Sequence, residues 1–199
     1  MYSTKTATTN NEEFTSSYMP VGINENVTLK EVNVNNANGK PFLEIIFENA
    51  AGQTATMTEW KNEKNLWVKT DEDLQNRDNQ QFGRILQVID AVKGNHAEFE
   101  GSSFTEMINW AKTQLEGDNA EVRIKVCYNK KGYTRVSNLG IFIEPMSVTE
   151  SQIKLFKNDL MERPIVADKE SVADPLAGQD MSSIPVTADS NTGADGLPF

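Results

Sequence analysis

The chain has 199 residues, a hydrophobic share of 38% and a formal net charge of −10 at pH 7. Its length and its mean hydropathy of −0.52 fit one domain of ordinary size with polar extensions. The single cysteine excludes an intramolecular disulfide, and no apolar run reaches the roughly 18 residues of a membrane helix. Because the first residues also lack a signal-peptide pattern, we expect a cytoplasmic location and no membrane partner.

The negative charge is unevenly distributed along the chain. Residues 164–199 carry one lysine and six acidic residues, whereas residues 21–163 carry 17 basic and 21 acidic residues. The first 20 residues are rich in Ser, Thr and Asn. These compositions predict a disordered arm over 1–20, a folded domain over 21–163 and a disordered acidic tail over 164–199. Because the domain itself is only mildly acidic, it has room for a local basic face.

The folded part begins with a predicted three-stranded meander. Residues 26–34 alternate apolar and polar side chains, which is typical of a strand with one buried face. Asn38-Gly39 predicts a hairpin turn, because both residues tolerate positive φ, and 41–49 form the return strand. A further turn leads into a third strand over 54–63.

Two helices are predicted in the middle of the chain. Apolar residues recur at helical spacing over 76–94, where Gly94 ends the pattern. The same spacing returns over 102–117, and Ser103 followed by Glu106 has the spacing of a capping box. The acidic run 71–73 is interpreted as a solvated loop rather than a metal site.

Strand patterns return after the second helix. Residues 120–128 and 133–136 form a predicted hairpin around the turn 129–132, and 141–143 extend that edge of the sheet. A final helix is expected over 147–163, with Thr149 as its N-cap.

This element order predicts a mainly β fold with helices. It matches a five-stranded OB-fold barrel with a helical insert between strands 3 and 4, followed by a C-terminal helix and a disordered acidic tail. Such barrels bind oligonucleotides or oligosaccharides on one sheet face, between the loop joining strands 1 and 2 and the loop joining strands 4 and 5. Here those loops are 35–40 and 129–132.

Enzymatic function has little support in the sequence. His96 and Cys127 are the only residues of their kinds, so the familiar zinc patterns are missing, as are the phosphate-binding and nucleophile motifs. We therefore predict no catalytic residue, no metal and no cofactor.

Aromatic and basic residues instead gather in two segments, a combination typical of proteins that bind single-stranded nucleic acid. The two segments supply the predicted site: Trp60, Lys61, Lys64, Trp67 and Lys69 in the first, and Arg123, Lys125, Lys130, Lys131, Tyr133 and Arg135 in the second. Alternatives remain for several of them. Trp60 could close the end of the core, the turn lysines could serve solubility, and the face carrying Arg123 and Lys125 could contact phosphate, acidic partners or water.

The last five residues, Asp195-Gly196-Leu197-Pro198-Phe199, resemble the C-terminal tip of bacterial single-stranded DNA-binding proteins. In that family, acidic residues precede an Ile/Leu-Pro-Phe ending that docks replication and repair enzymes. The resemblance implies that Asp195, Leu197, Pro198 and Phe199 bind a partner protein, with the phenylalanine as the anchor. Gly196 departs from the pattern, since an acid is common at that place.

Over residues 20–146 the chain resembles single-stranded DNA-binding proteins of tailed bacteriophages. The segments GKPFLEIIFEN and VCYNKKGYTRVSNLGIFIEP carry this resemblance, together with the tryptophan-containing third strand. It implies an OB-fold that coats single-stranded DNA in viral replication, recombination and repair, in the host cytoplasm. It also implies base stacking by Trp60, Trp67 and Tyr133. The phosphate contacts that it implies are made by Lys61, Lys64, Arg123, Lys125, Lys130, Lys131 and Arg135, and it leaves a homo-oligomer open.

Two further hypotheses follow. The acidic tail would compete with DNA for the basic groove, so that DNA binding frees the tip for partners. The rival function class is a module that binds only proteins, as a virion or scaffold component, and the net charge of −10 favours it. A nuclease is a third alternative, but the sequence offers no metal-binding set of carboxylates for it.

Overall fold

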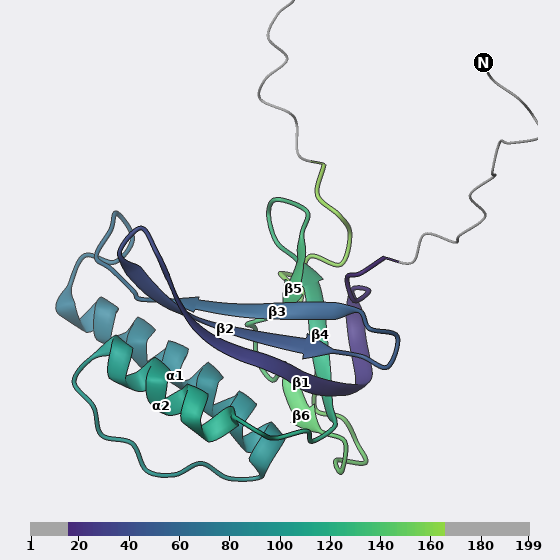
Figure 1. Cartoon of the computed structure of the whole chain (residues 1–199). Helices are drawn as coiled ribbons and strands as arrows, with labels where there is room; N and C mark the ends of the chain where they lie inside the picture. Colours follow the sequence, from purple (N-terminus) through teal and green to yellow (C-terminus); the bar gives the residue numbers. More distant parts are fainter. Residues whose placement is uncertain (1–15, 166–199) are drawn as a thin grey trace, which may run out of the picture. The chain divides into compact units, whose positions relative to one another are not determined.

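Figure 1 shows the computed structural model, which describes residues 16–165. The described residues hold six strands and two helices. In chain order these are β1 (Gly22–Ala37), β2 (Lys40–Glu48), β3 (Thr54–Trp60), α1 (Asp71–Lys93), α2 (Phe104–Leu115), β4 (Val122–Tyr128), β5 (Thr134–Val136) and β6 (Ile143–Pro145).

The first three strands form the predicted antiparallel meander. The β1–β2 turn is made by Asn38 and Gly39, both of which have positive φ. A bulge between Leu29 and Glu31 interrupts the register of β1 against β2. Because side chains alternate between the two faces of a strand, this extra residue keeps both Leu29 and Val32 on the buried face.

The strands form one antiparallel path that does not close into a barrel. The hydrogen-bonded order is β3-β2-β1-β4-β5, and β6 pairs with β4. β1 pairs with two strands. Its first residues pair with β4, and its later residues pair with β2. β3 and β5 lie side by side at the two ends of this path, but no ladder joins them among residues 16–165. The prediction of a mainly β fold with helices is confirmed, and the sheet is open.

Two features explain the open edge. β5 is only three residues long, from Thr134 to Val136. The edge of β3 at Thr54 is occupied instead by the preceding N-terminal segment. The Met19 N–H donates to the Thr54 carbonyl, and the Thr54 N–H donates to the Ser17 carbonyl.

This pairing shows that the folded part begins earlier in the chain than the predicted boundary at residue 21. Met19 is buried in the core, although the sequence places it in the disordered arm. Residues 16–20 therefore belong to the fold, and the remainder of the predicted arm lies outside the described residues.

Both predicted helices are present and lie against one side of the sheet (Figure 1). α1 begins five residues before the predicted start, because Thr70 and Asp73 form a capping box. The acidic run 71–73, expected in a loop, is the first turn of this helix, where carboxylates interact favourably with the helix dipole. Gly94 ends α1 with φ 83°, and Ser103 and Glu106 form the predicted capping box of α2.

The predicted helix over 147–163 is wrong. Those residues are irregular and cover the outer face of β4. Their backbone bonds outside the segment: the Tyr128 N–H donates to the Leu160 carbonyl, and the Lys125 ammonium donates to the Lys154 carbonyl. We call residues 146–165 the strap. Its bonds to β4 replace the i to i−4 bonds that a helix would need.

Candidate nucleic-acid interface

The structure divides the predicted site residues into three sets. Trp60, Lys61, Lys64, Trp67 and Lys69 lie at the end of β3 and in the loop 61–70. Lys130, Lys131, Tyr133 and Arg135 lie on the β4–β5 hairpin. All nine are exposed. The third set, Arg123 and Lys125, is buried in β4.

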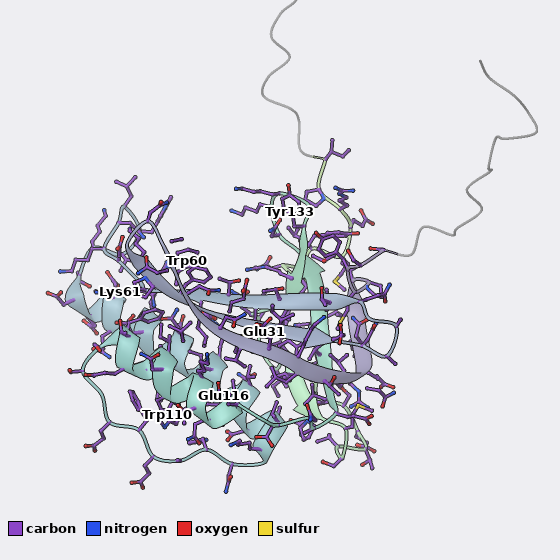
Figure 2. The ribbon with its side chains drawn as sticks, in the orientation of Figure 1. Glu31, Trp60, Lys61, Trp110, Glu116 and Tyr133 are labelled. Carbon is purple, nitrogen blue, oxygen red and sulfur yellow. The ribbon has the colours of Figure 1, made fainter. Side chains whose placement is uncertain are left out.

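One aromatic residue of each exposed set lies on the same side of the sheet. Figure 2 places Trp60 and Tyr133 above the strands as drawn, while Trp110 lies below, among the helices. β3, which ends at Trp60, and β5, which carries Arg135, are neighbours in space across the open edge. Trp110 packs with Phe82 and Phe99 against the core.

Trp60 forms an aromatic platform with a residue that the sequence analysis missed. Phe42 is its cross-strand partner, and the two rings stack with centroids 4.2 Å apart and planes 21° from parallel. The Trp60 residue is still 44% exposed, so the platform faces solvent. The signal in the sequence was the alternation in β2, where Phe42 falls on the face opposite the buried Leu43.

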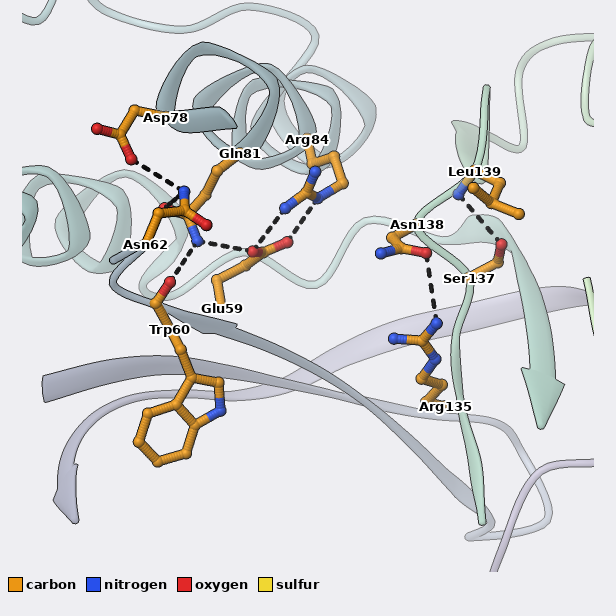
Figure 3. A network of polar contacts seen from close by, with 10 residues as sticks. All are labelled: Glu59, Trp60, Asn62, Asp78, Gln81, Arg84, Arg135, Ser137, Asn138 and Leu139. Atoms are coloured by element: carbon orange, nitrogen blue, oxygen red, sulfur yellow. Dashed lines mark hydrogen bonds and ion pairs between the residues drawn. The ribbon is translucent and has the colours of Figure 1, made fainter. Parts of the chain in front are cut away.

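The backbone of Trp60 is fixed by helix α1 (Figure 3). The amide of Gln81 donates to the Trp60 carbonyl at 2.8 Å and to the carboxylate of Glu59 at 2.9 Å. Arg84 completes this network with a bidentate pair to Glu59, at 2.7 and 2.8 Å. The indole points away from the network, so the contacts fix the main chain and leave the ring free (Figure 3).

The loop 61–70 carries a second exposed aromatic residue. Trp67 is 85% exposed, while Val68 beside it is buried and anchors the loop. Two ion pairs tie the loop to its surroundings, from Lys40 to Glu63 at 2.8 Å and from Lys64 to Asp71 at 2.6 Å. The hydrogen bond and positive charge of Lys40 lower the pKa of the Glu63 carboxyl.

The β4–β5 hairpin presents a third aromatic residue between basic side chains. The Asn129 side-chain oxygen accepts hydrogen bonds from the N–H groups of Lys131 and Tyr133, at 2.9 and 3.1 Å. Gly132 has φ 79°, and a Cβ there would lie 3.1 Å from the Arg163 side chain. The turn therefore requires glycine, and it leaves Tyr133 62% exposed.

Arg123 pairs with acids inside the protein, one of the alternatives open from the sequence. Its guanidinium donates to Glu25 at 2.8 Å and to Glu144. The Glu144 hydrogen bond raises the pKa of Arg123, assisted by Glu25 and opposed by desolvation. Burial raises the pKa of Glu144, but hydrogen bonds from Ser151, Gln152 and Arg123 outweigh it and lower that pKa overall.

Lys125 is fully buried, and its ammonium group donates three hydrogen bonds. Its ammonium donates to the Asp159 carboxylate at 2.8 Å and to the carbonyls of Leu139 and Lys154, both at 2.9 Å. Burial raises the pKa of Asp159, but hydrogen bonds from Lys125, Ser137 and the Phe156 N–H outweigh it and lower that pKa overall. Because Arg123 and Lys125 are occupied inside the fold, we leave both out of the candidate interface.

Neither a metal site nor a membrane span is found in the part of the chain that the structure describes. Within residues 16–165, no three His, Cys, Asp or Glu side chains are placed to hold a metal ion. Neither α1 nor α2 combines the length and the apolar character needed to cross a bilayer.

Comparisons with known proteins do not assign the chain to a family. No family model matches it, and no curated protein matches it. One similar solved structure is the A-subunit of the AB5 toxin from E. coli with Neu5Gc-2,3Gal-1,3GlcNAc. The similarity covers 65% of this chain and 85% of that chain, at 12% identity and a TM-score of 0.28. A similarity at that level carries no argument about fold or function.

Proposed function

We propose that this chain is a non-sequence-specific single-stranded DNA-binding protein, not an enzyme, that coats DNA in viral replication, recombination and repair. The observation that carries the proposal is the exposed Trp60–Phe42 platform. It lies directly before the loop 61–70, which carries Trp67 and three lysines, all exposed. Aromatic faces accept any base, and lysines contact any phosphate, so this combination binds without reading sequence.

The binding energy has two sources in this proposal. Each base stacked on an aromatic side chain contributes about 1–3 kcal/mol. The phosphate contacts come from the exposed basic residues Lys61, Lys64, Lys69, Lys130, Lys131 and Arg135. Phosphate contacts release counterions, so affinity falls as salt rises.

The fold supports this placement of the site. We infer a partly open relative of the OB-fold barrel, because β3 and β5 face each other at the ends of the strand path. In OB-folds the ligand lies on the sheet face between the strand 1–2 and strand 4–5 loops. The corresponding turns here are Asn38-Gly39 and 129–132, and the platform and Tyr133 lie on the strands and hairpin next to them.

The C-terminal tip completes the proposal as the partner-binding element. Asp195, Leu197, Pro198 and Phe199 lie outside the described residues, so their role rests on the sequence resemblance alone. In this proposal the tip recruits replication or recombination proteins to the coated strand. Deleting 188–199 would remove that recruitment while leaving the platform in place.

The test is a tryptophan-fluorescence titration of the full chain with oligo-dT at two salt concentrations. We expect quenching that weakens at higher salt. Trp60→Ala and Trp67→Ala should each reduce the quenching, whereas Trp110→Phe, altered on the helical side, should not. No quenching at low salt, for the full chain and for a chain lacking 164–199, would refute the proposal.

A module that binds only proteins is the second candidate, and the net charge of −10 favours it. The two functions differ in a simple chromatographic measurement. A single-stranded DNA-binding protein is retained on immobilised single-stranded DNA and elutes with salt, whereas a protein-only module passes through.

A further inference from the structure

The tip of the loop 61–70 exposes two large apolar side chains next to each other. Leu66 is 83% exposed and Trp67 is 85% exposed, and among residues 16–165 only Ile165 shows a more exposed large apolar side chain. Base stacking accounts for Trp67, but leucine has no aromatic face. The exposure of Leu66 therefore needs a separate explanation.

A defined turn holds this pair outward. The Asn65 side-chain oxygen accepts hydrogen bonds from the N–H groups of Trp67 and Val68, at 2.8 and 3.1 Å. The Asn65 N–H donates to the Val68 carbonyl at 3.0 Å, and the Val68 side chain is buried. Three hydrogen bonds and one buried anchor thus fix a turn whose two outermost side chains are apolar.

Both ends of the loop are also fixed. The Asn62 amide donates to Asp78 of α1 at 2.9 Å, and the Thr70–Asp73 capping box closes the far end. The apolar tip is therefore presented by a braced loop that begins directly after Trp60. A small, braced apolar projection between lysines has the form of the wedges that DNA-binding proteins insert between base steps.

We propose that Leu66 is such a wedge, which enters the base step at a junction between single-stranded and double-stranded DNA and opens the duplex end. This activity rests on the proposed function and goes beyond it, since coating a strand requires no wedge. Trp67 would stack on the freed base while Lys64 and Lys69 contact its flanking phosphates. Leu and other apolar side chains inserted in this way unstack the step they enter.

The surroundings of the tip favour a nucleic-acid strand over a lipid surface. Asp71, Glu72 and Asp73 follow the loop directly and are exposed. A flat anionic bilayer that received Leu66 and Trp67 would also meet this acidic turn, at an electrostatic cost. A DNA strand is narrow enough to follow Lys69 and the aromatic residues past the acidic turn, and its phosphate would replace Asp71 as the partner of Lys64.

The test uses a forked duplex with 2-aminopurine at the first paired position, because this base becomes brighter when it unstacks. We expect a rise in its fluorescence when the full-length protein saturates the single-stranded arm. Leu66→Ala should lose most of the rise while its affinity for oligo-dT stays within about twofold, the usual range for an exposed substitution. Leu155→Ala is the control, because Leu155 is an exposed leucine that lies in the strap and not in the loop 61–70. This variant should behave like the unmodified protein.

Other outcomes would overturn the wedge and separate it from the proposed function. If Leu66→Ala opens the junction as well as the unmodified protein at equal saturation, opening comes from trapping of the free strand alone, and the wedge is refuted. If the unmodified protein binds no oligo-dT, the proposed function itself fails. Binding to phosphatidylserine vesicles that depends on Leu66, with no junction opening, would assign the tip to membranes instead.

Discussion

Two regions of this molecule carry basic residues close together in the sequence, but in one region these side chains are buried and in the other they are exposed. In β4, Arg123 and Lys125 alternate with core residues, and the strap covers them. In the loop 61–70, Lys61, Lys64 and Lys69 are all exposed, and nothing in the described part of the chain covers them. The role of a basic side chain in this protein therefore depends on whether another segment of the chain covers its face of the strand or loop.

The two regions also differ in how much folding stability is lost when a basic side chain is removed. A buried ion pair is costly to break, because removal of one partner leaves an unpaired charge without water. An exposed lysine can be removed with little effect on folding, but its phosphate contact is lost. Substitutions in the two regions should therefore separate stability from DNA affinity.

The largest effect is expected at Lys125. Lys125→Met leaves the Asp159 carboxylate buried without its charged partner, and we expect a loss of about 3–5 kcal/mol in the free energy of unfolding. Urea denaturation measures it. Lys61→Met is the matched control and should stay within about 0.5 kcal/mol. If the double variant Lys125→Met, Asp159→Asn is no more stable than the single one, the uncompensated charge is not the cause.

The second-largest effect on folding stability is expected from acid, which acts on the same region. The pKa values of Asp159 and Glu144 are lowered in the folded protein, so their contribution to stability is complete above the unfolded values of about 3.9 and 4.3. It is lost as the pH falls below those values and through the folded pKa of each group. Urea midpoints measured from pH 6 down to pH 2 should fall in that window. The decline should be shallower in the Lys125→Met, Asp159→Asn variant; an equal slope would assign it to other groups.

In the exposed region, the largest effect is expected at the platform. Trp60→Ala removes one stacking ring and should cost about 1–3 kcal/mol of binding energy for oligo-dT, or roughly 5- to 150-fold in affinity. Fluorescence anisotropy of a labelled oligonucleotide measures it. The salt dependence should be unchanged, since no phosphate contact is lost. A change in salt slope with no loss at low salt would contradict the stacking role.

A smaller effect is expected at Gln81, which positions the backbone of Trp60. Gln81→Met removes the hydrogen bonds to the Trp60 carbonyl and to Glu59, each of which contributes about 1 kcal/mol. We expect weaker oligo-dT binding than that loss of stability alone explains, under conditions where the variant is fully folded. Gln75→Met, on the exposed part of the same helix, serves as the control. Normal affinity in folded Gln81→Met would make the residue purely structural.

The smallest effect is expected from single lysines of the loop. Lys69→Gln should lower the magnitude of the salt slope by about 0.7, the value for one phosphate contact on a single strand. Lys157→Gln, an exposed lysine in the strap, should leave the slope unchanged. Equal slopes for both variants would place the DNA path away from the loop 61–70.

Most elements could be predicted from the sequence because their patterns are local. Alternation and an Asn-Gly turn define β1 and β2, and a capping box with helical spacing defines α2. The strap was mispredicted because Ile153, Phe156 and Leu160 have helical spacing by chance. Its conformation is decided by Lys125, whose ammonium needs the Lys154 carbonyl and Asp159, and that demand comes from 29 and 34 residues away.

The candidate site shows the same division. The exposure of the residues in the loop 61–70 and in the turn 129–132 could be predicted, because turns and loops lie on the surface. Trp60 and Arg135 lie on strands, where the sequence leaves the exposed face open. Phe42 could not, since its role depends on the register that places it opposite Trp60. The burial of Arg123 and Lys125 depends on Glu25, Glu144 and Asp159, none of which is a neighbour in sequence.

The bulge in β1 sets which changes in chain length this protein can tolerate. Deleting Lys30 would remove the extra residue and still leave Leu29 and Val32 on the same face, in an unbroken alternation. A deletion at Asn33 instead would turn Val34 outward and expose it. Insertions and deletions among related sequences should therefore gather at Lys30 and avoid the rest of the strand.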